Sequence, residues 1–174
     1  RVLFQQLLHH YQLPSCQLLN TLSGAPSWPA GYIGSVSHAD GNAICCMMPD
    51  KIYQAIGIDI ETILGANSGT ELAVHIVQPK EQHLLLRATA VTYAEALTIA
   101  FSAKESLYKA LYPKVQRFFG FEDAELIKIL TDKQQFTLRL NIDLSPQLTA
   151  GMVFDGHYHF FDQQVISLIA LPSS

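Results

Sequence analysis

The spacing of apolar residues changes several times along this chain, and this limits the fold more than any other sequence feature. Apolar residues recur at helical spacing up to residue 13, alternate with polar ones in short runs up to residue 62, return to helical spacing from residue 70, and alternate again from residue 124. A period of 3.6 is typical of a helix and a period of two is typical of a strand. The order helix, strands, helices, strands therefore predicts an α+β protein with two small sheets.

Turn and breaker residues bound these elements. Pro14 ends the first predicted helix and Pro113 the longest one, because the residue before a proline disfavours the helical conformation. Residues 20–31 are rich in Gly, Pro and Ser and predict a loop,. The pair Asp40-Gly41 predicts a hairpin, since it supplies the positive φ angles of a tight turn. We expect helices at residues 1–13, 70–77, 79–87 and 91–112, and strands at 32–37, 43–48, 55–62, 124–130, 135–142, 152–161 and 165–171.

Composition narrows the classes of protein to which the chain can belong. Of its 174 residues 49% are hydrophobic and 15% charged, which excludes a disordered chain, because disorder needs low hydrophobicity and high net charge. The net charge of -4 argues against nucleic acid as a partner, since phosphate neutralisation needs a basic face. No apolar run is long enough to predict a membrane span. Cys16, Cys45 and Cys46 are odd in number and form no C-x-x-C motif, which predicts reduced thiols in a cytoplasmic protein,.

Two carboxylates share one face of the strand predicted at residues 55–62. Asp59 and Glu61 alternate with apolar residues, and the period of two places both side chains on the same side,. Like charges this close repel each other unless a cation lies between them, and Mg²⁺ prefers such oxygen ligands. Gly57, on the same strand, would allow a close backbone approach. The alternative is the solvent-facing side of an edge strand.

A second set of charged residues lies on the longest predicted helix. Glu105 and Lys109 are four positions apart with the acid first, which favours a surface ion pair,. The functional alternative makes Glu105 a third metal ligand or a base, and Lys109 a phosphate contact. Upstream, Ser37-His38 leaves a strand toward the Gly-containing turn, a place from which a loop can present phosphate contacts.

These motifs, in this order, resemble the 4′-phosphopantetheinyl transferase superfamily. The residues that carry the resemblance are Ser37, His38, Asp59, Glu61, Lys104, Glu105 and Lys109. The runs at residues 26–38, 101–106 and 119–121 are similar to the siderophore-synthetase branch of that family. The resemblance implies an α+β fold of two pseudo-symmetric halves, each a small antiparallel sheet packed with helices. In this single unit of residues 1–174, the halves would be approximately residues 1–63 and 64–174.

The resemblance also implies an activity. The family moves the 4′-phosphopantetheine group from coenzyme A to a serine of an apo acyl, aryl or peptidyl carrier protein in a Mg²⁺-dependent reaction, here in siderophore or other nonribosomal peptide synthesis. Asp59, Glu61 and Glu105 would hold Mg²⁺, and Lys109 would neutralise the diphosphate. Glu105 would also act as the base, with Glu81 as a weaker candidate. Further contacts with coenzyme A would come from Arg1, Ser37, His38 (at the 3′-phosphate) and Lys104.

Other functions stay open at this point. The chain begins at Arg1 inside an apolar helical pattern, and the family carries a further basic N-terminal segment, so we expect a start that is truncated. A truncated homologue could bind carrier protein or coenzyme A without turnover. A Mg²⁺-dependent phosphohydrolase would use the same three acids with water as the nucleophile. We also expect the protein to be a monomer.

Overall fold

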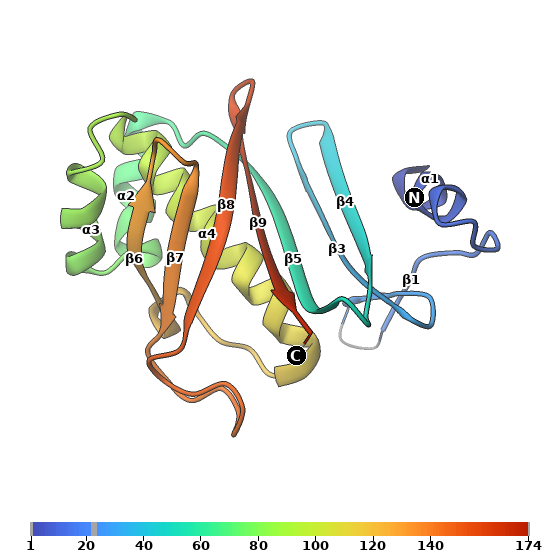
Figure 1. Ribbon diagram of the computed structural model, residues 1–174. Coiled ribbons are helices and arrows are strands. Elements are labelled where there is room, and N and C mark those ends of the chain that lie inside the picture. Colours follow the sequence, from blue (N-terminus) through green and yellow to red (C-terminus); the bar gives the residue numbers. More distant parts are fainter. Residues whose placement is uncertain (1, 22–23, 174) are drawn as a thin grey trace.

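One antiparallel sheet and one long helix form the larger part of the molecule (Figure 1). The structure is a computed structural model that describes residues 2–21 and 24–173, and for residues 66–70 the backbone alone. The strands follow the order β5-β9-β8-β7-β6. Their bounds are β5 (Tyr53–Thr62), β6 (Ala124–Leu130), β7 (Gln135–Leu140), β8 (Val153–Phe161) and β9 (Gln164–Pro172). The helix α4 (Tyr93–Val115) lies across one face of this sheet, and α2 (Ala66–Ile76) and α3 (Pro79–Leu86) cover its β6 side.

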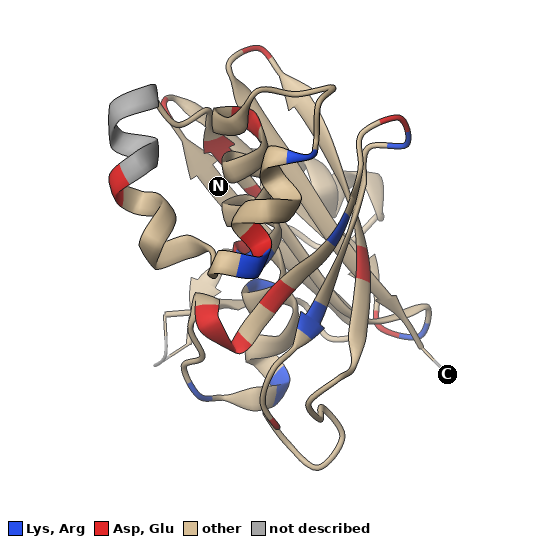
Figure 2. Cartoon of the chain, turned by 90° about the vertical axis from the view of Figure 1, so that its left-hand side faces the viewer, with Lys and Arg blue, Asp and Glu red and all other residues tan. Residues whose placement is uncertain are grey.

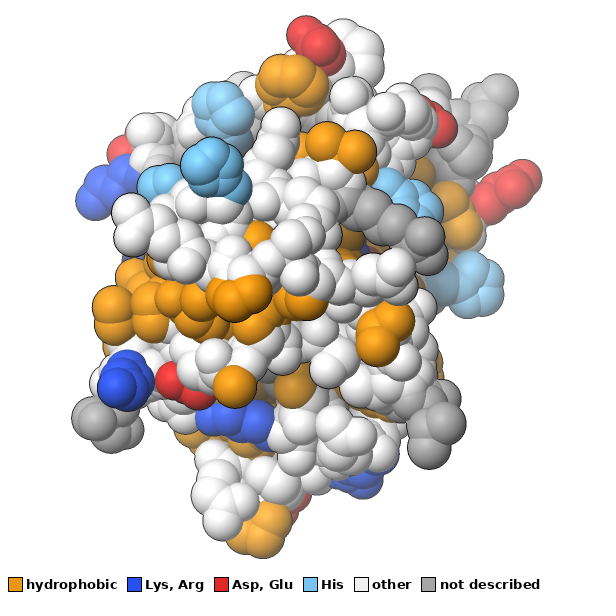
Figure 3. All heavy atoms as spheres, turned by 90° about the vertical axis from the view of Figure 1, so that its right-hand side faces the viewer, with side chains coloured by type: hydrophobic (Ala, Val, Ile, Leu, Met, Phe, Trp, Pro, Cys, Tyr) orange, Lys and Arg blue, Asp and Glu red, His pale blue; other side chains and the backbone are white. Residues whose placement is uncertain are grey.

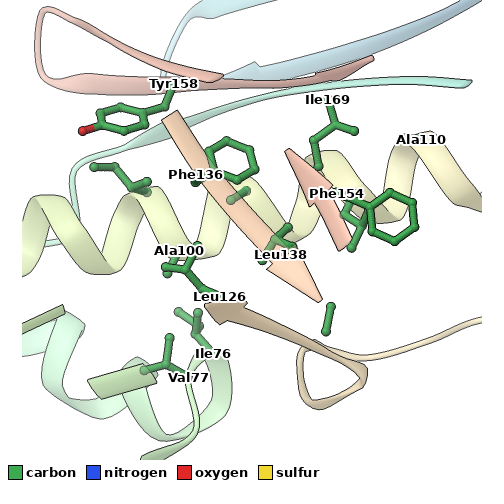
Figure 4. Close-up of a cluster of buried hydrophobic side chains, with 14 of the residues drawn as sticks. Ile76, Val77, Ala100, Ala110, Leu126, Phe136, Leu138, Phe154, Tyr158 and Ile169 are labelled. Carbon is green, nitrogen blue, oxygen red and sulfur yellow. The ribbon is translucent and has the colours of Figure 1, made fainter. Parts of the chain in front are cut away.

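The core lies between this sheet and α4. Along β8, Phe154 and Tyr158 are buried while their neighbours in sequence are exposed, as expected for a strand with one solvated face. Figure 4 shows side chains of the sheet, among them Phe136 and Leu138, directed at α4 near Ala100. The alanines on this side of α4 are short, so the helix approaches the strands closely and larger strand residues fill the space between them.

Helix α4 has a well-defined start and a longer end than the sequence predicts. Thr92 accepts a hydrogen bond from the backbone of Glu95, whose carboxylate accepts one from Thr92 N, so the two form a capping box,. The expected end before Pro113 is wrong, because the helix continues to Val115. A proline in the last turn removes only one N–H donor. Gln116 ends the helix in the left-handed conformation and donates from its backbone N–H to Tyr112 O.

A separate hairpin lies beside β5. It consists of β3 (Tyr32–Ala39) and β4 (Asn42–Pro49), and its turn residues Asp40 and Gly41 have φ angles of 40° and 82°. The predicted Asp-Gly hairpin is therefore confirmed. On the far side of β4 lies α1 (Val2–His10), whose Phe4 and Leu8 pack on Met47 in a small second core. Short strands β1 (Leu19–Asn20) and β2 (Pro26–Ser27) pair within the region expected to be a loop.

The predicted α+β class is confirmed, but the arrangement of the sheets differs from the expectation of two small sheets. The described residues form one five-stranded and two two-stranded sheets. β5 pairs with β9, which is more than 100 residues away in sequence, instead of extending the hairpin that precedes it. A division into halves near residue 63 stays a prediction.

The surface is mixed in character. Figure 2 shows acidic and basic residues interspersed on the side of α2, α3 and β6. Figure 3 shows a band of hydrophobic side chains across the opposite side, where α1 and the β3–β4 hairpin lie. Within the described part of the chain, no helix is both long and apolar enough to cross a membrane.

Candidate active site

The predicted carboxylates lie near one another where β5 passes under α4. Asp59 is 1% exposed and Glu61 is half-buried, both on β5. Glu105 and Lys109 come from α4, one turn apart. The close contact of the two elements depends on Gly57, since a Cβ at that position would lie 1.9 Å from Ser106 O of α4. The close approach that Gly57 was expected to allow is present.

Lys109 pairs across the site with Asp59 and not along its own helix with Glu105. Its Nζ lies 2.6 Å from Asp59 Oδ1 and donates to Ser37 Oγ at 2.8 Å. Ser37 in turn donates to the same Asp59 oxygen at 2.8 Å. Among the described residues, no ion pair joins Glu105 and Lys109, so the surface-pair alternative is wrong.

The second oxygen of Asp59 has no partner. Oδ2 is the one buried side-chain N or O atom of the described residues that makes no hydrogen bond. A buried carboxylate oxygen without a donor is costly, and a hard cation would satisfy it. No three Asp, Glu, His or Cys side chains within residues 2–21 and 24–173, residues 66–70 apart, already converge as a ligand set. The carboxylate oxygens suit Mg²⁺ in their chemistry, but among the described residues they do not already form a complete ligand set.

The pKa values of the neighbouring glutamates, Glu61 and Glu105, reflect the negative charge of this site. Burial, followed by the charges of Asp59 and Glu105, raises the pKa of Glu61 from 4.5 to about 7. Burial and the charge of Asp59 also raise the pKa of Glu105, and Lys109 opposes that rise. Nearby negative charge thus disfavours ionisation of both glutamates, and Lys109 offsets only part of this effect,.

Two clefts meet at this site. The larger, of about 600 Å³, lies between the hairpin, the segment at residues 20–28 and the C-terminal half of α4, and it is lined by His38 and Lys109. The smaller, of about 270 Å³, is lined by Glu105 and by the aromatic residues that follow α4, Phe118, Phe119 and Phe121. Tyr108 lines both. Lys109 thus lines the large cleft and Glu105 the apolar one, whereas Asp59 and Glu61 line neither.

Lys104 makes three hydrogen bonds within the protein. Its side chain is buried, and Nζ donates to Ile76 O at 2.8 Å, Phe121 O at 2.9 Å and Glu81 Oε2 at 3.0 Å. An ammonium has three N–H donors, and all three are used within the protein. The lysine joins α2, α3 and α4 to the segment before β6 and leaves no ammonium N–H free, although its side chain lines the smaller cleft. A contact from Lys104 to coenzyme A stays a prediction.

Glu81 is equally occupied. It is 0% exposed, and its carboxylate accepts hydrogen bonds from the backbone N–H groups of Gln78 and Leu126. It also accepts one from the ammonium of Lys104. Both carboxylate oxygens therefore have partners within the protein, and neither is free to take a proton from a substrate.

The other predicted contacts have different outcomes. His38 is exposed at the large cleft. Ser37 is 8% exposed and holds Asp59 and Lys109, and its hydroxyl is already engaged with both. Arg1 lies outside the described residues. The apolar cleft was not predicted. The sequence signal that could have indicated it is the aromatic group Phe118, Phe119 and Phe121 shortly after the helix.

Comparison with known proteins decides the family. A model of the 4′-phosphopantetheinyl transferase superfamily matches residues 55–167, and a model of the 4′-phosphopantetheinyl transferase N-terminal domain matches residues 1–48. The chain belongs to this superfamily. The superfamily match includes the whole carboxylate site and Lys109, whereas His38 falls in the match to the N-terminal domain.

Relatives within the 4′-phosphopantetheinyl transferase superfamily include enterobactin synthase component D of Salmonella typhimurium. It is 40% identical over 127 residues, which are 73% of this chain and 49% of the relative. The protein of that name from Escherichia coli O157:H7 is 41% identical over 63% of this chain and 49% of its own length. A 4′-phosphopantetheinyl transferase, Svp of Streptomyces mobaraensis, is 34% identical over 99% of this chain and 70% of its own.

The chain spans about half the length of the enterobactin synthase relatives that it matches. A solved holo-(acyl-carrier-protein) synthase from Bacillus anthracis, in complex with CoA, matches with a TM-score of 0.43 and 16% identity over 71% of this chain and 99% of that chain. That similarity is too low for a comparison of residues.

Proposed function

We propose that this protein transfers the 4′-phosphopantetheine group of coenzyme A to a serine hydroxyl of an apo carrier protein. The observation that carries the proposal is the buried Asp59 oxygen that lacks a partner. It lies near Glu61 and Glu105, and Lys109 and Glu105 each line a cleft. The superfamily membership of residues 55–167 supports it. A diphosphate bound at this point would have a nucleotide end and a pantetheine end, and each would have a cleft.

Each residue then has a defined task. Asp59, Glu61 and Glu105 would hold Mg²⁺, which when bound neutralises the charge on diphosphate oxygens. Lys109 is partly exposed to the large cleft, and we assign its ammonium a contact with the diphosphate. His38, at the rim of the same cleft, would meet the 3′-phosphate. The apolar cleft beside Glu105 would receive the pantetheine arm.

The proton of the reaction goes to a carboxylate. The serine oxygen attacks the phosphorus that carries pantetheine, the bond from this phosphorus to the bridging oxygen breaks, and adenosine 3′,5′-bisphosphate leaves. Glu105 is our candidate for the base, because it lines the apolar cleft and its pKa is raised by burial and by the charge of Asp59,. Lys109 stabilises the charge that develops on the diphosphate.

The carrier protein and pathway are a finer part of the proposal. Several relatives are enterobactin synthase components, which favours a carrier domain of siderophore synthesis or of other nonribosomal peptide synthesis. An acyl or aryl carrier protein would be modified by the same chemistry. A measurement with each carrier protein is therefore needed to distinguish among them.

Mass spectrometry tests the proposal directly. An apo carrier protein is incubated with the purified protein, coenzyme A and Mg²⁺, with a parallel sample in EDTA. A mass gain of one phosphopantetheine group, absent in EDTA, is the expected result. Release of phosphate from coenzyme A without loading would instead indicate a phosphohydrolase, and binding of the carrier without any mass change would indicate a non-catalytic homologue.

A further inference from the structure

The β3–β4 hairpin, which carries His38, has no backbone ladder to the main sheet within the described residues. β3 is held on β5 by side chains instead. Ser35 Oγ accepts a hydrogen bond from Ile58 N at 3.0 Å, and Ser37 donates to Asp59. Both serines lie before the turn, so they hold β3 up to Ser37, whereas the residues from His38 through the turn lie beyond these contacts.

The tip has its own attachment, through Gln164. This residue begins β9, is 4% exposed, and lies more than 120 residues from the hairpin in sequence. Its Nε2 donates to Ala39 O at 2.9 Å and its Oε1 accepts from Asn42 Nδ2 at 2.8 Å. Figure 1 shows the ends of the β3–β4 and β8–β9 hairpins at the same upper side of the molecule.

A carboxamide is suited to this position. Ala39 and Asn42 are the last paired residues of the β3–β4 ladder, and one offers a carbonyl acceptor while the other offers an amide donor. Only a side chain with a donor and an acceptor satisfies both. Nε2 also reaches Thr62 Oγ1 at 3.4 Å, and Thr62 donates to Asp40 in the turn. Gln164 is thus the buried centre of the contact.

We propose that Gln164 is a positioning residue, which holds the hairpin tip on the main sheet and thereby sets the place of His38 over the large cleft. The inference rests on the proposed function, in which His38 meets the 3′-phosphate of coenzyme A. Dephospho-coenzyme A lacks that phosphate. Discrimination between the two ligands therefore depends on a glutamine that touches neither of them.

The first test is the mobility of the tip. Gln164→Met keeps the length of the side chain and removes both hydrogen bonds, and Gln163→Met changes the exposed glutamine next to it as a matched control. We expect hydrogen–deuterium exchange of the peptide over residues 36–45 to become at least several-fold faster in Gln164→Met. Exchange in that peptide should stay at the parent rate in the control, and exchange in β7 should stay unchanged in both.

The second test is ligand binding, measured by calorimetry without turnover. In Gln164→Met the affinity for coenzyme A should fall about tenfold, as for the loss of a charge-assisted hydrogen bond, and the affinity for dephospho-coenzyme A should fall much less. The double variant Gln164→Met/His38→Ala should discriminate no worse than His38→Ala alone, because Gln164 acts through His38. A purely structural role would weaken both ligands equally.

The outcomes separate this inference from the proposed function. Unchanged exchange at the tip, or equal losses for the two ligands, overturns the role of Gln164. A parent protein that binds neither ligand overturns the proposed function, whereas the exchange result still decides whether Gln164 holds the tip. If Gln164→Met does not fold, Asn42→Ala removes one of the two hydrogen bonds from the exposed side and leaves the bond to Ala39 O. It should give smaller changes in the same direction, with faster exchange at the tip and weaker discrimination, and no change in either would overturn the role of Gln164.

Discussion

At the scale of single residues, the buried carboxylate of Asp59 is the group that most needs compensation of its charge by its surroundings. Its carboxylate is buried, one oxygen has two donors and the other has none. The protein tolerates this arrangement because Lys109 compensates the charge from one side. A metal at the free oxygen would compensate it from the other side, and the nearby glutamates would gain from the same cation.

The first prediction concerns metal binding. Asp59→Asn keeps the size of the side chain but removes the charge that would hold Mg²⁺, so transfer to carrier protein should fall at least a hundredfold. Mg²⁺ stabilises the folded protein only if it binds there, so the rise in melting temperature on addition of Mg²⁺ should also vanish. Asp155→Asn changes an exposed acid of β8 and should keep both properties. A variant that still responds to Mg²⁺ as the parent does would contradict the metal assignment.

The second prediction concerns pH. The pKa of Glu61 rises from 4.5 to about 7 on folding, so the folded protein binds this proton more tightly than the unfolded chain. Glu61 therefore lowers stability progressively as the pH rises from about 4.5 to about 7, with the full penalty above that range. In the absence of metal, Glu61→Gln should raise the melting temperature by a few degrees at pH 8 and by much less at pH 4.

Glu71→Gln serves as the control for this pH effect, since Glu71 is an exposed acid of α2. Its melting temperature should follow that of the parent at both pH values. Equal stabilisation of Glu61→Gln at pH 4 and pH 8 would show that Glu61 is not the group that senses the excess of negative charge.

At the scale of elements, the contact between β5 and α4 brings the site together. Gly57 lies against Ser106 O, and the site residues Glu105 and Lys109 flank that point on α4. Ser167 of β9 adds hydrogen bonds to Ser102 O and Ser106 Oγ in the same layer. The helix is thus held at a short distance from the strand by small residues and hydroxyl groups.

The third prediction tests this contact. Gly57→Ala places a methyl group where backbone atoms of α4 lie, and neither the strand nor the helix can yield by a small side-chain rotation. We expect a loss of about 3 kcal/mol or more in the free energy of unfolding, measured by urea denaturation. Gly120→Ala is the control, because its Cβ would meet only the end of the Glu122 side chain. Equal losses in the two variants would contradict the argument.

The fourth prediction concerns the buried pair of Lys104 and Glu81, which lie 2.8 Å apart. Lys104→Met leaves a buried carboxylate without its cation and should cost about 3–5 kcal/mol of stability. Lys104→Met/Glu81→Gln removes both charges and should recover a large part of that loss. A double variant less stable than Lys104→Met would show that the carboxylate is held mainly by its two backbone donors.

At the scale of the whole molecule, two cores of unequal size carry the fold. The main core spans the five-stranded sheet and α4, whereas the second contains three fully buried residues, Phe4, Leu8 and Met47. A small core with few buried contacts opens at a lower free energy than a large one. The large cleft lies on the hairpin side of the molecule. A ligand in this cleft would therefore contact the part of the fold that the second core stabilises.

The fifth prediction follows from that inequality. In native-state hydrogen exchange, the amides of β4 should exchange by local opening well below the free energy of global unfolding. The amides of β8, in the middle of the main sheet, should exchange only through global unfolding. Similar protection of the two strands would mean that the hairpin and the main sheet unfold as one unit.

Local chemistry determined much of what the sequence predicted correctly. The helical and strand periods place most elements within a few residues, the Asp40-Gly41 turn is present, and Asp59 and Glu61 share a face because a strand has a period of two. Helix α4 continues past its predicted end because a proline in the last turn destabilises a helix only slightly. The residues around Pro113 in the sequence do not show that it lies in the last turn.

The partners of each residue were decided by the tertiary structure alone. Lys109 is four residues from Glu105 but pairs with Asp59, 50 residues away, because the packing of α4 on β5 brings a buried charge within its reach. Lys104 has the same charge as Lys109 and lies on the same helix, yet its ammonium pairs with Glu81 and donates to the carbonyls of Ile76 and Phe121. Gln164 meets the hairpin across more than 120 residues. Periodicity states which face a side chain occupies, whereas only the folding of distant segments against each other decides what that face meets.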